Sequence, residues 1–192
     1  EQGVARSTSV MMPCPWVPHM ARYIVEHHVD AGLHLTLTSE WKDYRWGPVA
    51  GAAAVPGLVD STGNFWPDVA DVVRHASAEE VSREIEAQLQ KAERMGFHPT
   101  HLDSHMGTLF ATPAFLQAYI RLGIRYHIPV MFPGGHDSYL RQQMHMDDAQ
   151  LQQLQAMGRL LWQAGLPVLD DLHNTSYDWQ IPPDMPRDDD HL

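Results

Sequence analysis

A strict alternation of side chains between Gly32 and Trp41, in the segment GLHLTLTSEW, constrains the fold of this chain more than any other feature. Leucine occupies the odd positions from 33 to 37, while His34, Thr36 and Thr38 occupy the even positions. A period of two is typical of a β-strand with one apolar and one polar face. We therefore expect a strand over residues 32–38 that places the His34 imidazole opposite the leucines.

A second histidine follows another short apolar segment, PTHLDSHMG, which runs from Pro99 to Gly107. Asp103 and His105 are two residues apart, so in an extended chain their side chains point the same way. A neutral imidazole donates a lone pair to a divalent metal, and a neighbouring carboxylate adds charge or accepts a hydrogen bond from the ligand ring. These segments predict His34 and His105 as metal ligands, with ring nitrogens about 3 to 4 Å apart around one cation.

Strand-like and helix-like segments alternate along the rest of the chain, which predicts a parallel sheet with crossover helices. Ser77 and Glu80 form a capping box that begins one helix. Thr112 and Pro113 are typical of the first turn of another helix. The segment from 39 to 76 is expected to be a long irregular loop, and such loops are usually functional. The expected strands cover residues 7–12, 32–38, 101–104, 128–132 and 166–169, and the expected helices cover 17–27, 77–96, 112–123 and 147–165.

About five βα units favour an α/β fold built as a partial or distorted (β/α) barrel with parallel strands. The chain has 192 residues and 44% apolar content, which suits one core and a single domain over residues 1–192. Active sites of barrels lie at the carboxyl ends of the strands. Because Asp103 and Asp171 fall at or just beyond such ends, we predict both as catalytic carboxylates, with Asp170 and His173 beside Asp171. The alternatives are a turn for Asp103 and a solvated loop for the others.

Substrate-binding residues are expected in the loops at the carboxyl ends of the strands. Trp41 and Trp46 are expected to stack on a substrate ring through their flat apolar faces, and His136 is expected to join them. Packing of the long loop onto the barrel is the alternative for both tryptophans.

Charge and cysteine content narrow the classes of partner. The formal charge of −11 argues against nucleic acid and anionic membranes, because Lys and Arg nowhere form a basic stripe. Cys14 is the single cysteine, so an internal disulfide framework is excluded and a cytoplasmic location is slightly favoured. No transmembrane segment or signal peptide is visible in the sequence, although a missing N-terminus would have removed a leader.

Several segments together resemble the YdjC-like family of carbohydrate deacetylases, in which a Gly-Leu-His-Leu strand and an Asp-Ser-His strand each supply a metal-binding histidine. The resemblance covers residues 1 to 140 best, and it rests also on STSVMMPCPW (7–16), GLVDSTGNFWPD (57–68) and REIEAQLQKAERMGFHPTHLDSH (83–105). It implies a barrel-like fold and a cation held by His34, His105 and an aspartate. This chain departs from the family in having no Asp-Asp pair before Ser7 and in carrying Gly107 where a second histidine often occurs. We therefore expect it to lack the family's first strand and its C-terminal strands.

The resemblance implies a metal-dependent hydrolase that removes acetyl groups from an N-acetylated sugar or oligosaccharide. Zn²⁺ is expected first, with Mg²⁺, Ni²⁺ or Co²⁺ as alternatives. In that mechanism an absent aspartate is the base and a histidine of the absent C-terminal part is the acid. Two alternatives stay open: another barrel metalloenzyme, such as a sugar isomerase or phosphodiesterase, and a catalytically inactive sugar-binding relative. Whether the protein forms a homo-oligomer is also open.

Overall fold

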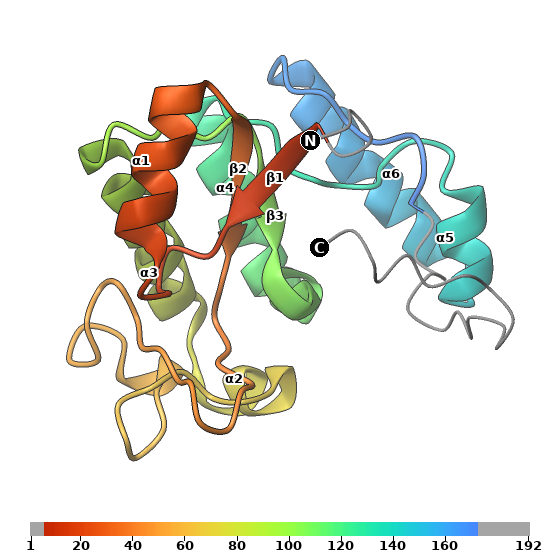
Figure 1. The fold of residues 1–192 in the computed structure, drawn as a ribbon. Helices are drawn as coiled ribbons and strands as arrows, with labels where there is room; N and C mark the ends of the chain where they lie inside the picture. Colours follow the sequence, from red (N-terminus) through yellow and green to blue (C-terminus); the bar gives the residue numbers. More distant parts are fainter. Residues whose placement is uncertain (1–5, 173–192) are drawn as a thin grey trace, which may run out of the picture.

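The computed structural model describes residues 6–172 as an α/β structure in which short parallel strands alternate with helices (Figure 1). Among these residues we find no helix with the length and apolar character that a bilayer span requires. The strands are β1 (Ser7–Val10), β2 (Asp30–Leu35) and β3 (Leu102–Ser104). The helices are α1 (Val17–His27), α2 (Val69–His75), α3 (Ala78–Arg94), α4 (Pro113–Tyr126), α5 (Ser138–Gln143) and α6 (Asp148–Gln163), with 3-10 helices η1 (Pro56–Leu58) and η2 (His105–Phe110).

The strands lie side by side in chain order and run parallel, as β1-β2-β3. Two single parallel bridges continue this order, because Val130 pairs with Leu102 and Leu169 pairs with Pro133. Five parallel segments therefore follow one another from β1 to residue 169. This is the arrangement of a partial (β/α) barrel, so the predicted fold class is confirmed.

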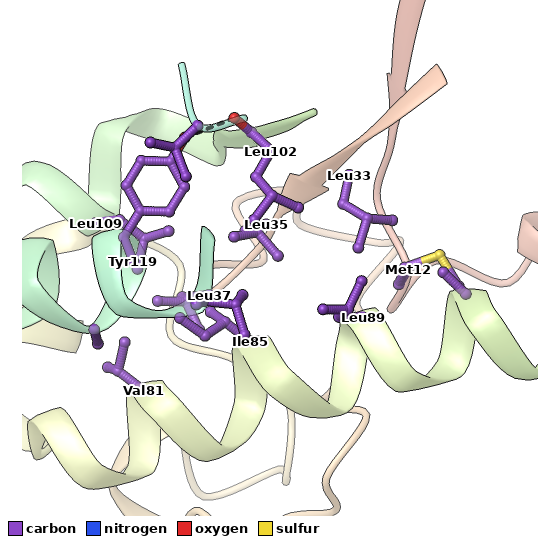
Figure 2. Close-up of a cluster of buried hydrophobic side chains, with 14 of the residues drawn as sticks. Met12, Leu33, Leu35, Leu37, Val81, Ile85, Leu89, Leu102, Leu109 and Tyr119 are labelled. Carbon is purple, nitrogen blue, oxygen red and sulfur yellow. Dashed lines mark hydrogen bonds between the residues drawn. The ribbon is translucent and has the colours of Figure 1, made fainter. Parts of the chain in front are cut away.

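The apolar face of β2 packs against α3, as the alternating sequence predicts (Figure 2). Leu33, Leu35 and the following Leu37 are fully buried, and so are Ile85 and Leu89 of α3. Full burial of one such side chain stabilises the fold by about 1.5–3 kcal/mol. This layer holds β2 in place and leaves His34 on its opposite face.

Local signals in the sequence locate the starts of the helices well. α1 covers the expected residues 17–27. The capping box of Ser77 and Glu80 is present at the start of α3, and the Thr112 side chain accepts a hydrogen bond from the Phe115 N–H at the start of α4. In each case the side chain satisfies a backbone N–H that has no partner within the helix.

The predicted end of α4 at Gly123 is wrong, because the helix continues to Tyr126. Gly123 lies against Val130, and a Cβ at position 123 would come within 2.5 Å of the Val130 Cγ1 atom. This glycine allows α4 to pack closely on the neighbouring segment and does not end the helix. The turn instead comes at His127, which has a φ of 54°.

The observed strands are shorter than predicted. The ladder of β2 ends at Leu35 because its partner β3 ends at Ser104, where the chain turns into η2. The strands expected over 128–132 and 166–169 form the single bridges described above. Beyond Leu35 the backbone of Thr36 pairs with a side chain: its N–H donates to Gln88 Oε1 (3.1 Å) and its C=O accepts from Gln88 Nε2 (2.7 Å).

The segment 39–76 is more ordered than predicted, because it contains η1 and α2. The α5 helix was also not predicted. Glu84 of α3 fastens the long segment, since its carboxylate accepts hydrogen bonds from the N–H groups of Val49 (2.9 Å) and Ala50 (2.8 Å). Burial raises the pKa of Glu84, although these hydrogen bonds and one from Gln88 oppose the shift. The segment is thus held against the helix that also supports β2.

Candidate metal centre

Three neighbouring strands bring one polar side chain each to the same face of the sheet. His34 of β2 is the register partner of Asp103 in β3, and its Nδ1 atom lies 2.5 Å from Asp103 Oδ1. Ser9 of β1 donates a hydrogen bond to Asp103 Oδ2 at 2.9 Å. Parallel pairing in chain order produces this group, because it aligns residues that are 69 and 94 positions apart. Both oxygens of Asp103 are therefore engaged.

His105 approaches His34 from the first residue of η2, just after β3. Its Nδ1 atom lies 3.1 Å from His34 Nε2, and the two rings meet edge to face at 71°. On its other side, His105 Nε2 lies 3.0 Å from Glu40 Oε2. The next two residues, Met106 and Gly107, have φ values of 51° and 64°, so the chain turns sharply as soon as the imidazole has been placed. A left-handed methionine is uncommon, and such strain is concentrated at functional sites.

The positions of the ring protons are assigned from the hydrogen-bond partners of each imidazole. An ionised carboxylate only accepts hydrogen bonds, so His34 donates from Nδ1 to Asp103 and His105 donates from Nε2 to Glu40. The nitrogens that face each other, His34 Nε2 and His105 Nδ1, then both present lone pairs at 3.1 Å. Two lone pairs at this distance repel each other unless a positive charge lies between them.

This donor set fits a divalent cation. Two nitrogens bound to one cation at about 2.0 to 2.1 Å lie about 2.8 to 3.4 Å apart when the N–metal–N angle is between about 90° and 110°, and the observed separation of 3.1 Å falls in that range. Each ring also has a carboxylate on its far nitrogen, which is the usual environment of a metal-ligating imidazole. In residues 6–172, however, no group of three or more His, Cys, Asp or Glu side chains is arranged to hold a metal. The described part of the chain thus offers two converging imidazole nitrogens, and metal binding stays a prediction.

Aromatic side chains lie just beyond Glu40 in the chain. The rings of Trp41, Tyr44 and Trp46 are 6.0 to 6.4 Å from one another. Trp41 is 60% exposed, whereas Trp46 is only 5% exposed and its indole N–H donates to Thr38 O at 2.8 Å. Trp41 and Tyr44 are therefore the exposed rings of this cluster, and the buried Trp46 packs against both. Substrate binding by Trp41 and Trp46 stays a prediction, and the burial of Trp46 favours the packing alternative for that residue.

Asp171 and His136 form a separate pair. His136 Nδ1 lies 3.3 Å from Asp171 Oδ2, and the Asp171 carboxylate accepts from the N–H groups of Tyr139 and Leu140 in the first turn of α5. Burial opposes ionisation of Asp171, but these N–H groups outweigh it and hold its pKa below the usual value. Among residues 6–172, no hydrogen bond or ion pair joins this pair to His34 or His105. Its catalytic and substrate-binding roles stay predictions, and His173 lies outside the described residues.

Sequence reasoning overlooked Glu40 and Ser9. Glu40 continues the even-numbered series of His34, Thr36 and Thr38, so the same period of two that found His34 contained a signal for it. That signal is weak, because the ladder of β2 ends five residues earlier, at Leu35. Ser9 carries no comparable signal.

The negative charges of Glu40 and Asp103 contribute to raised pKa values at two nearby groups. Burial raises the pKa of Cys14, and the negative charge of Glu40 raises it further. Burial together with the charge of Asp103 raises the pKa of Tyr119, whose hydroxyl donates to the Leu102 carbonyl at 2.7 Å. Both groups therefore stay protonated at neutral pH. They add no negative charge to that of Asp103 and Glu40.

Comparison with known proteins agrees with the resemblance found in the sequence. The family model described as YdjC-like protein matches residues 1–185. A carbohydrate deacetylase of Thermus thermophilus is 37% identical over 125 residues, which cover 65% of this chain and 43% of that protein. A carbohydrate deacetylase of Brevibacillus brevis is 33% identical over 133 residues, which cover 69% and 50%. The chain thus spans about half the length of these relatives.

One solved structure supports the fold. It is the crystal structure of an Enterococcus faecalis V583 protein described as a putative cellobiose-phosphate cleavage protein. The two chains agree with a TM-score of 0.63 over 79% of this chain and 55% of the other, at 24% sequence identity. At this identity the likeness shows a common fold.

Proposed function

Because this chain belongs to the YdjC-like protein family, we propose that the protein is a metal-dependent hydrolase that removes N-linked acetyl groups from amino sugars or short oligosaccharides. The two relatives are carbohydrate deacetylases by name, which supports the reaction class. The observation that carries the proposal is the convergence of His34 Nε2 and His105 Nδ1 at the carboxyl ends of β2 and β3. Zn²⁺ is the first choice of cation because both donors are imidazole nitrogens, with Mg²⁺, Ni²⁺ or Co²⁺ as alternatives.

His34 and His105 would hold the cation through these two nitrogens. When bound, a divalent cation polarises the acetyl carbonyl and lowers the pKa of a coordinated water. Asp103 keeps the His34 ring in one tautomer and one orientation, and Ser9 holds the Asp103 carboxylate in turn. Since both Asp103 oxygens accept hydrogen bonds, we assign Asp103 to positioning His34 and not to accepting a proton from water. This narrows the catalytic role predicted from the sequence.

Trp41 and Tyr44 would bind the sugar. Trp41 directly follows Glu40, whose carboxylate contacts His105, so a sugar stacked on Trp41 would lie on the side of the site that His105 faces. Stacking of a pyranose on an indole face buries apolar surface without demanding a particular hydroxyl pattern. The site would therefore select for a sugar ring, and the two histidines would fix the position of the acetyl group through the cation that they hold.

Zinc uptake and acetate release test the proposal together. We expect His34→Ala and His105→Ala each to abolish stoichiometric zinc uptake and the release of acetate from N-acetylglucosamine and its oligomers, both measured at saturating zinc on the complete natural protein. His27→Ala is the matched control, because His27 lies on α1 and stacks on Tyr23. Equal losses in all three variants, or zinc uptake without acetate release from any N-acetylated sugar, would contradict the proposal.

A further inference from the structure

Glu40 is the carboxylate on the far side of His105, and its role was not apparent from the sequence. Its Oε2 atom lies 3.0 Å from His105 Nε2, and the two side chains are 28% and 13% exposed. An ion pair or charge-assisted hydrogen bond this well shielded is screened less by solvent than a surface pair. The contact joins residues 65 positions apart, so it reflects the tertiary fold and not local chain geometry.

The backbone just before Glu40 is held by several hydrogen bonds. The preceding residue, Ser39, is fully buried; its N–H donates to the Trp66 carbonyl at 2.9 Å, and its hydroxyl accepts from the Trp46 N–H at 3.0 Å. Arg45 also donates to the Ser39 hydroxyl, at 3.2 Å. These contacts fix the backbone from which the Glu40 side chain extends to His105 in η2. A carboxylate that was merely solvated would need no such support.

The two histidines therefore have matching environments. Asp103 accepts from Nδ1 of His34, and Glu40 accepts from Nε2 of His105. An imidazole has two neutral tautomers, and the acceptor at one nitrogen decides which nitrogen keeps its lone pair. Without an acceptor at Nε2, His105 is free to carry its proton on Nδ1, and that proton would point at His34 Nε2 and block the space between the rings.

We propose that Glu40 is a positioning residue that fixes His105 in the Nε2–H tautomer and so directs its Nδ1 lone pair toward His34. The inference rests on the metal dependence of the proposed function, and it adds a carboxylate that acts through His105. It also predicts that the two rings bind the cation through different nitrogens: Nε2 of His34 and Nδ1 of His105. Removing an acceptor of this kind typically costs about 10- to 100-fold in metal affinity.

Two readouts other than activity test this inference. Zinc affinity is measured by competition with a chromogenic chelator, and the His105 tautomer is measured by long-range ¹H–¹⁵N NMR on the metal-free protein at a pH where imidazoles are neutral. The His105 signals are assigned by their loss in His105→Gln. We expect the wild type to show the Nε2–H tautomer, and Glu40→Ala to show a mixture and a zinc affinity about 10- to 100-fold lower.

Glu40→Gln and Glu93→Gln complete the design. In Glu40→Gln the new amide oxygen still accepts from Nε2–H but carries no charge, so we expect the tautomer to be kept and the affinity loss to be smaller than in Glu40→Ala. Glu93 is exposed on α3, and Glu93→Gln should match the wild type in both readouts. A wild-type tautomer with zinc affinity within twofold in Glu40→Ala would overturn the role of Glu40. Failure of the wild-type protein to take up zinc would instead count against the proposed function itself.

Discussion

Gln88 provides the sharpest test of how the fold supports the candidate metal centre. Its side-chain amide imitates a neighbouring strand, because Oε1 accepts from the Thr36 N–H and Nε2 donates to the Thr36 C=O. Gln88 and Thr36 are both fully buried, so water cannot replace these bonds. The same Nε2 donates to Glu84 Oε1 at 2.8 Å. One side chain therefore joins the segment between His34 and Glu40 to α3.

Gln88→Leu keeps most of the side-chain volume and removes every hydrogen bond. Each of the two Thr36 backbone groups left without a partner costs about 1–3 kcal/mol, which gives about 2–6 kcal/mol. The extra apolar burial of leucine offsets part of this cost. We expect a net fall of about 2–4 kcal/mol in the free energy of unfolding, which is large against the usual total of about 5–15 kcal/mol for a domain.

The measurement is urea unfolding, combined with hydrogen exchange at the Thr36 amide. Exchange at Thr36 should accelerate more than exchange at the Leu33 amide, which donates to the His101 carbonyl and does not depend on Gln88. The matched control is Gln90→Leu, because Gln90 is exposed on the same helix and surface changes are usually within about 0.5 kcal/mol. If Gln88→Leu unfolds at the same urea concentration as Gln90→Leu, the reasoning about Thr36 is wrong.

Three further predictions concern Asp103, Trp41 and Glu84. Asp103→Asn, which leaves His34 without a charged acceptor, should lower zinc affinity about 10- to 100-fold, as a chelator competition would show; unchanged affinity would reduce Asp103 to a turn residue. Trp41→Ala should raise KM for an N-acetylglucosamine oligomer while the melting temperature changes little, because the ring is 60% exposed; a similar rise in KM for Trp162→Ala, which alters an exposed residue of α6, would argue against a sugar platform. Burial raises the pKa of Glu84 in the folded state, so the folded state binds the Glu84 proton more tightly than the unfolded chain does. Glu84 therefore favours folding most at low pH, and this contribution is lost as the pH rises from the unfolded-state pKa of about 4.3 through the raised folded-state pKa. Unfolding curves at several pH values should therefore show that the wild type loses stability relative to Glu84→Gln as the pH rises through this range. A stability difference that does not change with pH would refute the assignment.

Much of the fold was predictable because its signals lie within a few residues of one another. The capping box of Ser77 and Glu80 and the cap at Thr112 each operate over three residues, and both are present in the structure. The alternation around His34 needed only the period of a strand. The end of α4 was mispredicted because Gly123 is explained by a contact with Val130 and not by its own backbone conformation. The short helices α2 and α5 were overlooked because neither is long enough to show a helical period.

The candidate site also has one part that the sequence predicts and one part that only the tertiary structure determines. His34, Asp103 and His105 were identified from their place at the ends of two apolar segments, before any partner was known. Which atoms face each other was decided only in three dimensions: the proton positions of both rings follow from Asp103 and Glu40, and Glu40 meets His105 across 65 residues. Likewise Trp41 and Trp46 look equivalent in sequence, yet one is exposed and the other buried. Periodicity and capping depend on neighbouring residues and are therefore legible in a sequence, whereas a hydrogen-bond partner or a solvent-exposed ring depends on which distant segments the packed core brings together.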